Sequence, residues 1–308
     1  MARYFFCLLR HPLLLLVAFG MLPSGAKAQT FDLDAEYYEN PVAEHIAYLP
    51  DEIAGTSSLF FLDDRLWTCN DHGTLRLYAV DTLAGTIDSI VDLGVKVYDL
   101  EEVALDGEWI YFGDIGDNKG SRSELRILRL SRADLRAGLY RFDTIRFLYP
   151  DRTKVGARNF DCEAFVATAD SLYLFTKQWL GRNSVCYAVP NLPGTHTAER
   201  RFTLYTDGLV TGACYLPELR TLALIGYTLL LKPFVYLVDG FDGACFSQGR
   251  HRRIPLDNIA GNQMEGIATL DGIHYFLSRE TFTYHFYSRQ ASLFRLDLSG
   301  LPEESNVR

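Results

Sequence analysis

Residues 101–112 read Glu-Glu-Val-Ala-Leu-Asp-Gly-Glu-Trp-Ile-Tyr-Phe, which is a short apolar run, a turn and an aromatic-rich run. An Asp-Gly pair between two strand-forming runs is typical of a β-hairpin. The hairpin opens on an acidic residue, Glu101, ten positions before Tyr111. This unit therefore predicts two antiparallel strands joined by a tight turn.

Four other stretches repeat the unit, with an oxygen-bearing lead residue, an apolar run, a turn and a second strand-like run. They begin at Ser57, Glu163, Thr211 and Glu265. In all but the unit at Thr211, an aromatic residue follows the lead residue by ten positions; that unit needs a turn two residues longer, around Pro217. Two more strand-like runs follow each of the earlier hairpins. Four strands in about fifty residues is the spacing of a β-propeller.

The last unit has a third strand-like run, Ser292 to Leu298, but no fourth. The run Glu44 to Leu49, ahead of the first unit, can supply the missing strand and leave no open sheet edge. We therefore predict an all-β fold, a five-bladed β-propeller closed by an N-terminal strand. A six-bladed propeller is the alternative.

The first 28 residues have the features of a signal peptide. Two arginines precede the apolar run Leu13 to Leu22, which is too short to span a bilayer, and residues 26–28 (Ala-Lys-Ala) form a small-x-small cleavage signal. We expect an exported protein, periplasmic or extracellular, with residues 29–308 as one propeller domain. An uncleaved membrane anchor is the alternative.

Composition excludes several functions. The formal net charge is −9 and no basic stripe is present, so nucleic-acid binding is not expected. No second apolar run is long enough to cross a membrane. The five cysteines after residue 28 are scattered without a C-x-x-C pair, which argues against a zinc ribbon and for small buried side chains.

The lead residues predict a metal site. A propeller brings its innermost strands together around a central channel, so equivalent side chains on them would meet on the axis. Three converging carboxylates need a counter-ion, and oxygen ligands without His or Cys favour Ca²⁺, with Mg²⁺ possible in a tighter octahedron. Polar strand starts wetted by channel water are the alternative. The predicted ligands are Ser57, Glu101, Glu163, Thr211 and Glu265.

Further polar groups should reach the same face, because the second strand of each blade runs antiparallel to the first. Three carboxylates near the ends of these strands are candidate catalytic bases: Asp71, Asp114 and Glu280. Three basic residues are candidate contacts for a small anionic ligand such as a phosphate or a carboxylated sugar: Lys177, Arg158 and Arg279. For Asp117 and Asn118, an Asx-type turn explains the residue types equally well.

Several motifs resemble a large group of exported bacterial β-propeller proteins. They are residues 66–71 (Leu-Trp-Thr-Cys-Asn-Asp), 111–118 (Tyr-Phe-Gly-Asp-Ile-Gly-Asp-Asn), 160–164 (Phe-Asp-Cys-Glu-Ala), 171–177 (Ser-Leu-Tyr-Leu-Phe-Thr-Lys) and 211–213 (Thr-Gly-Ala). The resemblance covers most of the chain after residue 28 and implies the propeller fold without implying a reaction. Ser58 departs from the group, which tends to have Gly there.

The lead residues are also similar, more distantly, to those of the calcium-activated nucleotidase (apyrase) family. That family is a five-bladed propeller whose central Ca²⁺ is held by a Ser, Glu, Glu, Ser, Glu series, and Thr211 would replace the second Ser here. The likeness implies the same metal position. It does not imply nucleotidase activity, because the family's Asp-Asp-Arg-Thr-Gly run is here residues 70–74 (Asn-Asp-His-Gly-Thr), which lacks the arginine.

Three functions follow as hypotheses. The first is an exported calcium-binding propeller that acts as a module for a small anionic ligand or a protein partner. The second is a metal-dependent hydrolase of a phosphoester, nucleotide or lactone, in which Asp71, Asp114 or Glu280 is the general base. The third is a propeller whose ion only stabilises the blades.

Overall fold

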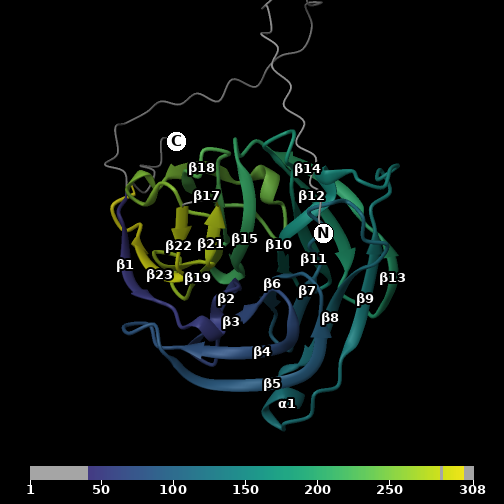
Figure 1. The fold of residues 1–308 in the computed structure, drawn as a ribbon. Helices are drawn as coiled ribbons and strands as arrows, with labels where there is room; N and C mark the ends of the chain where they lie inside the picture. Colours follow the sequence, from purple (N-terminus) through teal and green to yellow (C-terminus); the bar gives the residue numbers. More distant parts are fainter. Residues whose placement is uncertain (1–40, 285–286, 302–308) are drawn as a thin grey trace, which may run out of the picture. The chain divides into compact units, whose positions relative to one another are not determined.

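The computed structural model describes residues 41–284 and 287–301, and it is a five-bladed β-propeller (Figure 1). The predicted fold class is therefore confirmed. The proposed signal peptide, residues 1–28, lies outside the described residues. Within the described ranges, no helix is long and apolar enough to cross a bilayer.

Each blade is an antiparallel sheet that runs outward from the axis. The first contains β2 (Thr56–Leu62), β3 (Arg65–Asn70), β4 (Gly73–Val80) and β5 (Ile87–Val97). The second contains β6 (Leu100–Leu105), β7 (Trp109–Asp114), β8 (Leu125–Ser131) and β9 (Asp143–Leu148). The third contains β10 (Asp161–Ala167), β11 (Ser171–Lys177), β12 (Ser184–Pro190) and β14 (Glu199–Leu204).

The last two blades follow the same plan. The fourth contains β15 (Leu209–Leu216), β16 (Thr221–Tyr227), β17 (Pro233–Asp239) and β18 (Arg250–Pro255). The fifth contains β19 (Met264–Thr269), β20 (His274–Arg279), β23 (Ser292–Asp297) and β1 (Ala43–Tyr48). A hairpin of β21 (Phe282–Tyr284) and β22 (Tyr287–Arg289) lies between β20 and β23 in the chain.

The N-terminal strand closes the ring, as predicted. Strand β1 pairs antiparallel with β23, from Ala43 opposite Leu296 to Tyr48 opposite Ser292. This pairing supplies the fourth strand of the last blade and satisfies the outer edge of β23. The longer turn predicted near Pro217 is also present, as the 3-10 helix η3 (Pro217–Leu219).

Some short elements were not predicted. Strand β13 (Gly194–Thr197) leaves the third blade and pairs in parallel with β9 of the second. The helix α1 (Arg132–Arg136) begins at Ser131, whose hydroxyl accepts hydrogen bonds from the amides of Ala133 and Asp134. The remaining 3-10 turns are η1 (Asp51–Ile53), η2 (Arg158–Phe160), η4 (Phe246–Gln248) and η5 (Asp257–Ile259).

The core lies between neighbouring blades. Tyr111 of the second blade and Phe165 of the third are fully buried in one such cluster. Five of the chain's six cysteines fall in the described residues and all five are free thiols; Cys69, Cys162 and Cys186 are buried. Burial of apolar surface on both faces of each sheet holds the innermost strands in place around the axis.

Candidate functional site

Every innermost strand carries a β-bulge at its lead residue. In the first blade Thr56 pairs with Asn70 and Ser58 with Cys69, so that Ser57 is the extra residue. The same shift in register occurs in the other four blades, at Glu101, Glu163, Thr211 and Glu265. A bulge bends its strand and re-aims the side chain of the extra residue. The five lead residues are therefore equivalent in structure as well as in sequence.

Four of these residues line one polar cavity of about 230 Å³ at one end of the axis. They are Ser57, Glu101, Glu163 and Glu265. Thr211 is not part of the lining, and its hydroxyl donates a hydrogen bond of 2.6 Å to the carbonyl oxygen of Met264. The other lining residues are Asp71, Asp99, Asn118, Lys177, Trp179, Tyr227, Gln263 and Glu280.

The cavity holds six carboxylates and one lysine. Lys177 Nζ lies 2.6 Å from Glu163 Oε1 and 2.5 Å from Glu163 Oε2, and both side chains are buried. Burial alone would lower the pKa of Lys177, but Glu163 and the other nearby acids hold that pKa well above its usual value. Burial also raises the pKa of Glu163 well above its usual value, and Lys177 is the largest influence that opposes this shift. The two short contacts favour the charged forms of both partners. Of the other five carboxylates, Asp71 lies 2.6 Å from His72 Nδ1 and the remaining four have no cationic partner within hydrogen-bond distance among the described residues.

Burial is the main cause of raised pKa values among these remaining acids. It raises the pKa of Glu101 well above normal, with Glu163 adding repulsion. It raises the pKa of Glu265 to about 8, that of Glu280 to about 7 and that of Asp99 to about 6. None of these four side chains forms a hydrogen bond or salt bridge with the described residues. The cavity therefore holds crowded acid groups that have no cationic partner and that keep their protons to higher pH than usual.

The donor set fits a hard cation. Ser57 Oγ is buried and has no hydrogen-bond partner within the described residues, so it too has a free lone pair at the cavity. All these donors are oxygens, the ligands that Ca²⁺ and Mg²⁺ prefer. In the described ranges, no group of three or more His, Cys, Asp or Glu side chains is already arranged to hold a metal ion. Coordination of an ion would require carboxylate side chains to rotate toward the axis.

Gly116 lets the backbone approach two of the acids. A Cβ atom built at this position would collide with the carboxylates of Glu101 and Asp99. The loop after β7 therefore packs directly on these side chains, and this contact limits the positions they can adopt.

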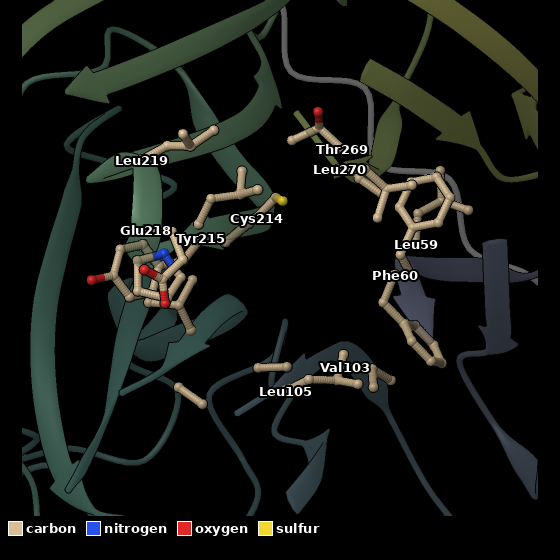
Figure 2. Close-up of a pocket in the computed structure, with 18 of the residues that line it drawn as sticks. Leu59, Phe60, Val103, Leu105, Cys214, Tyr215, Glu218, Leu219, Thr269 and Leu270 are labelled. Atoms are coloured by element: carbon tan, nitrogen blue, oxygen red, sulfur yellow. The ribbon is translucent and has the colours of Figure 1, made fainter. Parts of the chain in front are cut away.

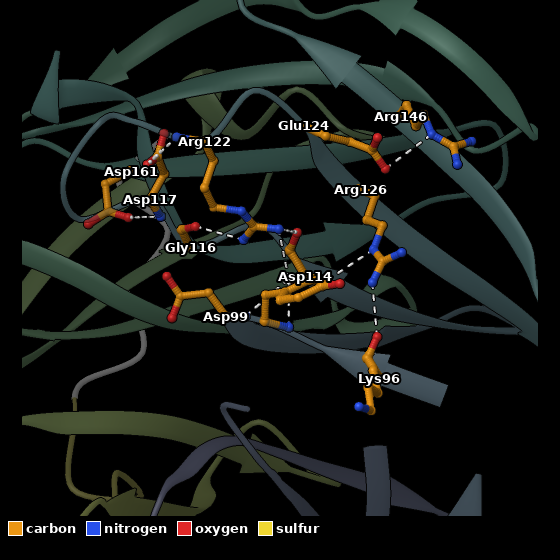
Figure 3. A network of polar contacts seen from close by, with 11 residues as sticks. Lys96, Asp99, Asp114, Gly116, Asp117, Arg122, Glu124, Arg126, Arg146 and Asp161 are labelled. Atoms are coloured by element: carbon orange, nitrogen blue, oxygen red, sulfur yellow. Dashed lines mark hydrogen bonds and ion pairs between the residues drawn. The ribbon is translucent and has the colours of Figure 1, made fainter. Parts of the chain in front are cut away.

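Asp114 lies outside the cavity lining and anchors the same loop (Figure 3). Its Oδ1 accepts a hydrogen bond of 2.8 Å from Arg122 Nη2, and its Oδ2 accepts one of 2.9 Å from Arg126 Nε. Oδ1 also accepts the amide of Asp99 at 3.1 Å. With both oxygens bound and the side chain fully buried, Asp114 positions the chain at Asp99.

Asp117 forms the turn that its residue type suggested. Its Oδ1 accepts hydrogen bonds from the amides of Ser121 and Arg122, at 2.7 and 3.0 Å. Its own amide donates to Asp161 Oδ1 at 2.7 Å, and its Oδ2 pairs with Arg152 at 2.8 Å. The side chain is thus committed to local structure.

The structure separates the three basic candidates. Lys177 is inside the cavity, and Arg158 lies at its edge, with its guanidinium 4.6 Å from the ring centre of Trp179 and its Nε bound to the carbonyl of Asn118. Arg279 lines a different cavity of about 420 Å³, where its Nε donates to the carbonyl of Gln290. Asp71 and Glu280, unlike Asp114, do line the axial cavity.

Sequence reasoning missed two lining residues, Asp99 and Gln263. Each lies two positions before a lead residue, so the segment entering the innermost strand carried the signal. Asp161 occupies the same position before Glu163; its Oδ2 accepts a hydrogen bond of 3.2 Å from Trp179 Nε1. This position therefore contributes to the cavity wall in the second and fifth blades, and in the third it contacts the lining residue Trp179.

The fold and the cavity define a β-propeller with an acidic axial site. Similar solved structures include the PQQ-bound aldose sugar dehydrogenase of Streptomyces coelicolor, at 10% identity and a TM-score of 0.44 over 83% of this chain and 97% of that chain. A putative 6-phosphogluconolactonase of Bacteroides uniformis matches at 14% identity and a TM-score of 0.40 over 82% of each chain.

An exo-β-1,3-galactanase of Phanerochaete chrysosporium matches at 8% identity and a TM-score of 0.50 over 83% of this chain and 64% of that chain. At this identity the likeness to the galactanase shows the fold alone. No family model matches the sequence, and no curated protein matches it.

Proposed function

We propose that the axial cavity binds a divalent cation, Ca²⁺ in the first place, and that the protein is an exported propeller serving as a binding module for a small anionic ligand or a protein partner. The observation that carries this proposal is the set of four carboxylates without hydrogen bonds or salt bridges to described residues, around one cavity: Asp99, Glu101, Glu265 and Glu280.

Charge supports a cation. With all six cavity acids ionised, Lys177 leaves an excess of five negative charges. Such acids must either take up protons or share a counter-ion, and a divalent cation serves several of them at once. Ca²⁺ is favoured over Mg²⁺ because it accepts six to eight oxygen ligands in a flexible geometry. The similarity of the lead residues to the apyrase series points to the same ion.

The ligand-binding role rests on the edge of the cavity. Lys177 Nζ lies 5.1 Å from the ring centre of Trp179, and Arg158 stacks on the same ring. An aromatic surface flanked by two cations suits a flat or sugar-like ligand with a carboxylate or phosphate. A bound divalent ion would remove the negative potential that otherwise repels such a ligand.

Calorimetric titration of EDTA-treated protein with Ca²⁺ and Mg²⁺ tests the cation site. We expect saturable Ca²⁺ binding, weaker Mg²⁺ binding, and loss of both in the double variant Glu101→Gln, Glu265→Gln. Glu108→Gln, which changes an exposed glutamate of the second blade, is the matched control. Equal heats in the double variant and the control would contradict the proposal.

A hydrolase is the second candidate, favoured by acids that titrate near neutral pH. Glu280, with its pKa raised to about 7, and Asp99, at about 6, line the cavity beside Trp179 and Tyr227. A carboxyl with such a pKa can accept and return a proton at physiological pH. A bound cation would supply polarisation of a substrate oxygen. Glu280 is the candidate base best placed for this chemistry.

A panel of nucleotides, phosphomonoesters and lactones, assayed with and without Ca²⁺, tests this candidate. We expect turnover to fall at least 100-fold in Glu280→Gln when it is assayed at saturating Ca²⁺, with the Ca²⁺ affinity of the same variant measured by calorimetry to separate loss of the base from loss of the ion. Export is tested separately by N-terminal sequencing of the secreted or periplasmic protein, which should begin at Gln29. An absence of turnover on the whole panel would leave the binding module as the function.

A further inference from the structure

The opposite end of the axis holds a second, larger cavity of about 560 Å³ (Figure 2). All five innermost strands contribute their second halves to it, for example Leu59 of β2, Val103 of β6 and Cys214 of β15. Side chains from opposite blades face a common space, and most of them are apolar. Cavities of this size and composition are typical of small-molecule sites.

The side chain of Glu102 lies between the linings of this cavity and the acidic one. Glu102 follows the acidic lining residue Glu101 and precedes Val103 of the apolar cavity. Its carboxylate accepts the amide of Val103 at 2.9 Å and the amide of Ala213, in the fourth blade, at 2.6 Å. The second and fourth blades are not neighbours in the ring, so this contact crosses the axis. The two cavities are therefore distinct sites.

The mouth of the apolar cavity exposes hydrophobic side chains. Leu219 is 49% exposed and Leu270 is 56% exposed, and both line the cavity. Leu219 belongs to η3, the longer turn of the fourth blade, and its Cδ1 would lie 3.1 Å from a Cβ added at Gly272 of the fifth. The turns of the fourth and fifth blades thus meet at the rim of the cavity, where their exposed leucines can contact a ligand.

The charges at this site select the ligand. No lysine, arginine or histidine is found among the described residues that line the cavity. The two ionisable acids of the lining, Glu218 and Asp271, belong to turns of the fourth and fifth blades. Asp271 is held by its own turn: its Oδ1 accepts the amides of Ile273 and His274, and its Oδ2 lies 2.7 Å from His274 Nδ1. Glu218 is therefore the carboxylate left available at the rim, and an anionic headgroup would meet its charge with no basic lining residue to offset it.

We infer that this second cavity binds a small molecule with a hydrocarbon body and a neutral or amine headgroup. The ligand buries its apolar part against the ends of the five innermost strands, and its polar end stays near Glu218 at the rim. This site is independent of the cation site at the other end of the axis.

Fluorescence titration with 1-aminoanthracene, a neutral apolar probe, tests the inference, followed by displacement with decanol, decylamine and decanoate. We expect saturable binding, with decanol and decylamine displacing the probe at concentrations at least tenfold lower than decanoate. Two variants should weaken the probe about tenfold or more: Leu105→Trp, which fills the cavity, and Leu219→Glu, which adds a charge at its mouth.

Leu83→Glu is the matched control, because Leu83 is an exposed leucine outside the cavity. Leu219 is also exposed, so its variant should fold even if Leu105→Trp does not. An absence of saturable binding would overturn the inference. So would equal probe affinity in the control and in Leu219→Glu, or decanoate as the strongest competitor, which would indicate adsorption elsewhere on the surface.

Discussion

Replacement of Lys177 by methionine tests whether its ammonium and a bound Ca²⁺ neutralise the same acids of the axial cavity. The change keeps most of the side chain's length and removes the ammonium that lies within 2.6 Å of both Glu163 oxygens. In metal-free protein Glu163 would then be buried without a positive partner. Loss of one member of a buried pair costs about 3–5 kcal/mol.

The expected size of the effect can be measured by thermal unfolding. For a domain of this length, 1 kcal/mol corresponds to roughly 2 °C, so the melting temperature of the variant in EDTA at pH 8 should fall by about 6–10 °C. Excess Ca²⁺ should recover much of this loss, because an ion at 100 times its dissociation constant stabilises by about 2.7 kcal/mol. The variant should also bind Ca²⁺ about tenfold or more tightly than the native protein, since no ammonium competes for Glu163.

Lys96→Met, which alters an exposed lysine of the first blade, is the control and should leave both quantities unchanged. A variant at position 177 that melts like the native protein in EDTA would refute the argument that the pair is ionised and stabilising. A variant that is destabilised but gains no affinity for Ca²⁺ would refute the argument that the ammonium and the ion compete for one site.

Three further results are expected. The free energy of unfolding of the metal-free protein should fall as pH rises from about 5 to 8. The reason is that Glu265 and Glu280, with pKa values raised to about 8 and about 7, keep protons in the folded state that the unfolded chain releases near pH 4.5. Chemical denaturation across this pH range in EDTA and in Ca²⁺ measures the pH dependence, which the ion should reduce. Gly116→Ala should weaken Ca²⁺ binding about tenfold in calorimetry, because its methyl group displaces Glu101. Glu102→Ala should lower the free energy of unfolding by about 2–4 kcal/mol in urea, because two amides lose their acceptor, and Glu102→Gln should restore part of it.

Each of these has an opposing outcome. A pH profile that rises toward pH 8 without metal would mean that the acids are already neutralised by other groups. Unchanged Ca²⁺ affinity after the glycine substitution would place the ion away from the second blade. Equal stability of the alanine and glutamine variants at position 102 would show that the contact across the axis contributes little.

The fold was predictable from sequence because the hairpin unit recurs. Turn dipeptides, apolar runs and the ten-residue spacing are local features, and the strand left over at Glu44 to Leu49 had one place to pair. Strand β13 was not predictable, because its pairing with β9 is parallel and joins two blades. Such a contact depends on the path of a long loop and leaves no periodic pattern in a four-residue segment.

The site was predictable in part. The five lead residues occupy equivalent positions, but the bulges that re-aim them are properties of strand register, which residue types do not reveal. Thr211 and Asp114 occupy positions equivalent to those of lining residues in other blades. Their side chains are instead hydrogen-bonded to neighbouring groups, Thr211 to the carbonyl of Met264 and Asp114 to Arg122. The Lys177–Glu163 pair joins two adjacent strands and became visible only once their side chains were placed.

The pairing of β1 with β23 makes closure of the ring depend on the two ends of the described fold. Strand β1 is synthesised well before β23, and until the two strands pair the fifth sheet has an unsatisfied edge. The ring closes only when segments about 250 residues apart have paired, the kind of long-range closure that slows folding. Proteolytic cleavage between β1 and β2 would allow β1 to leave the fifth blade. The exposed edge of β23 should then make the opened ring prone to assemble with other copies.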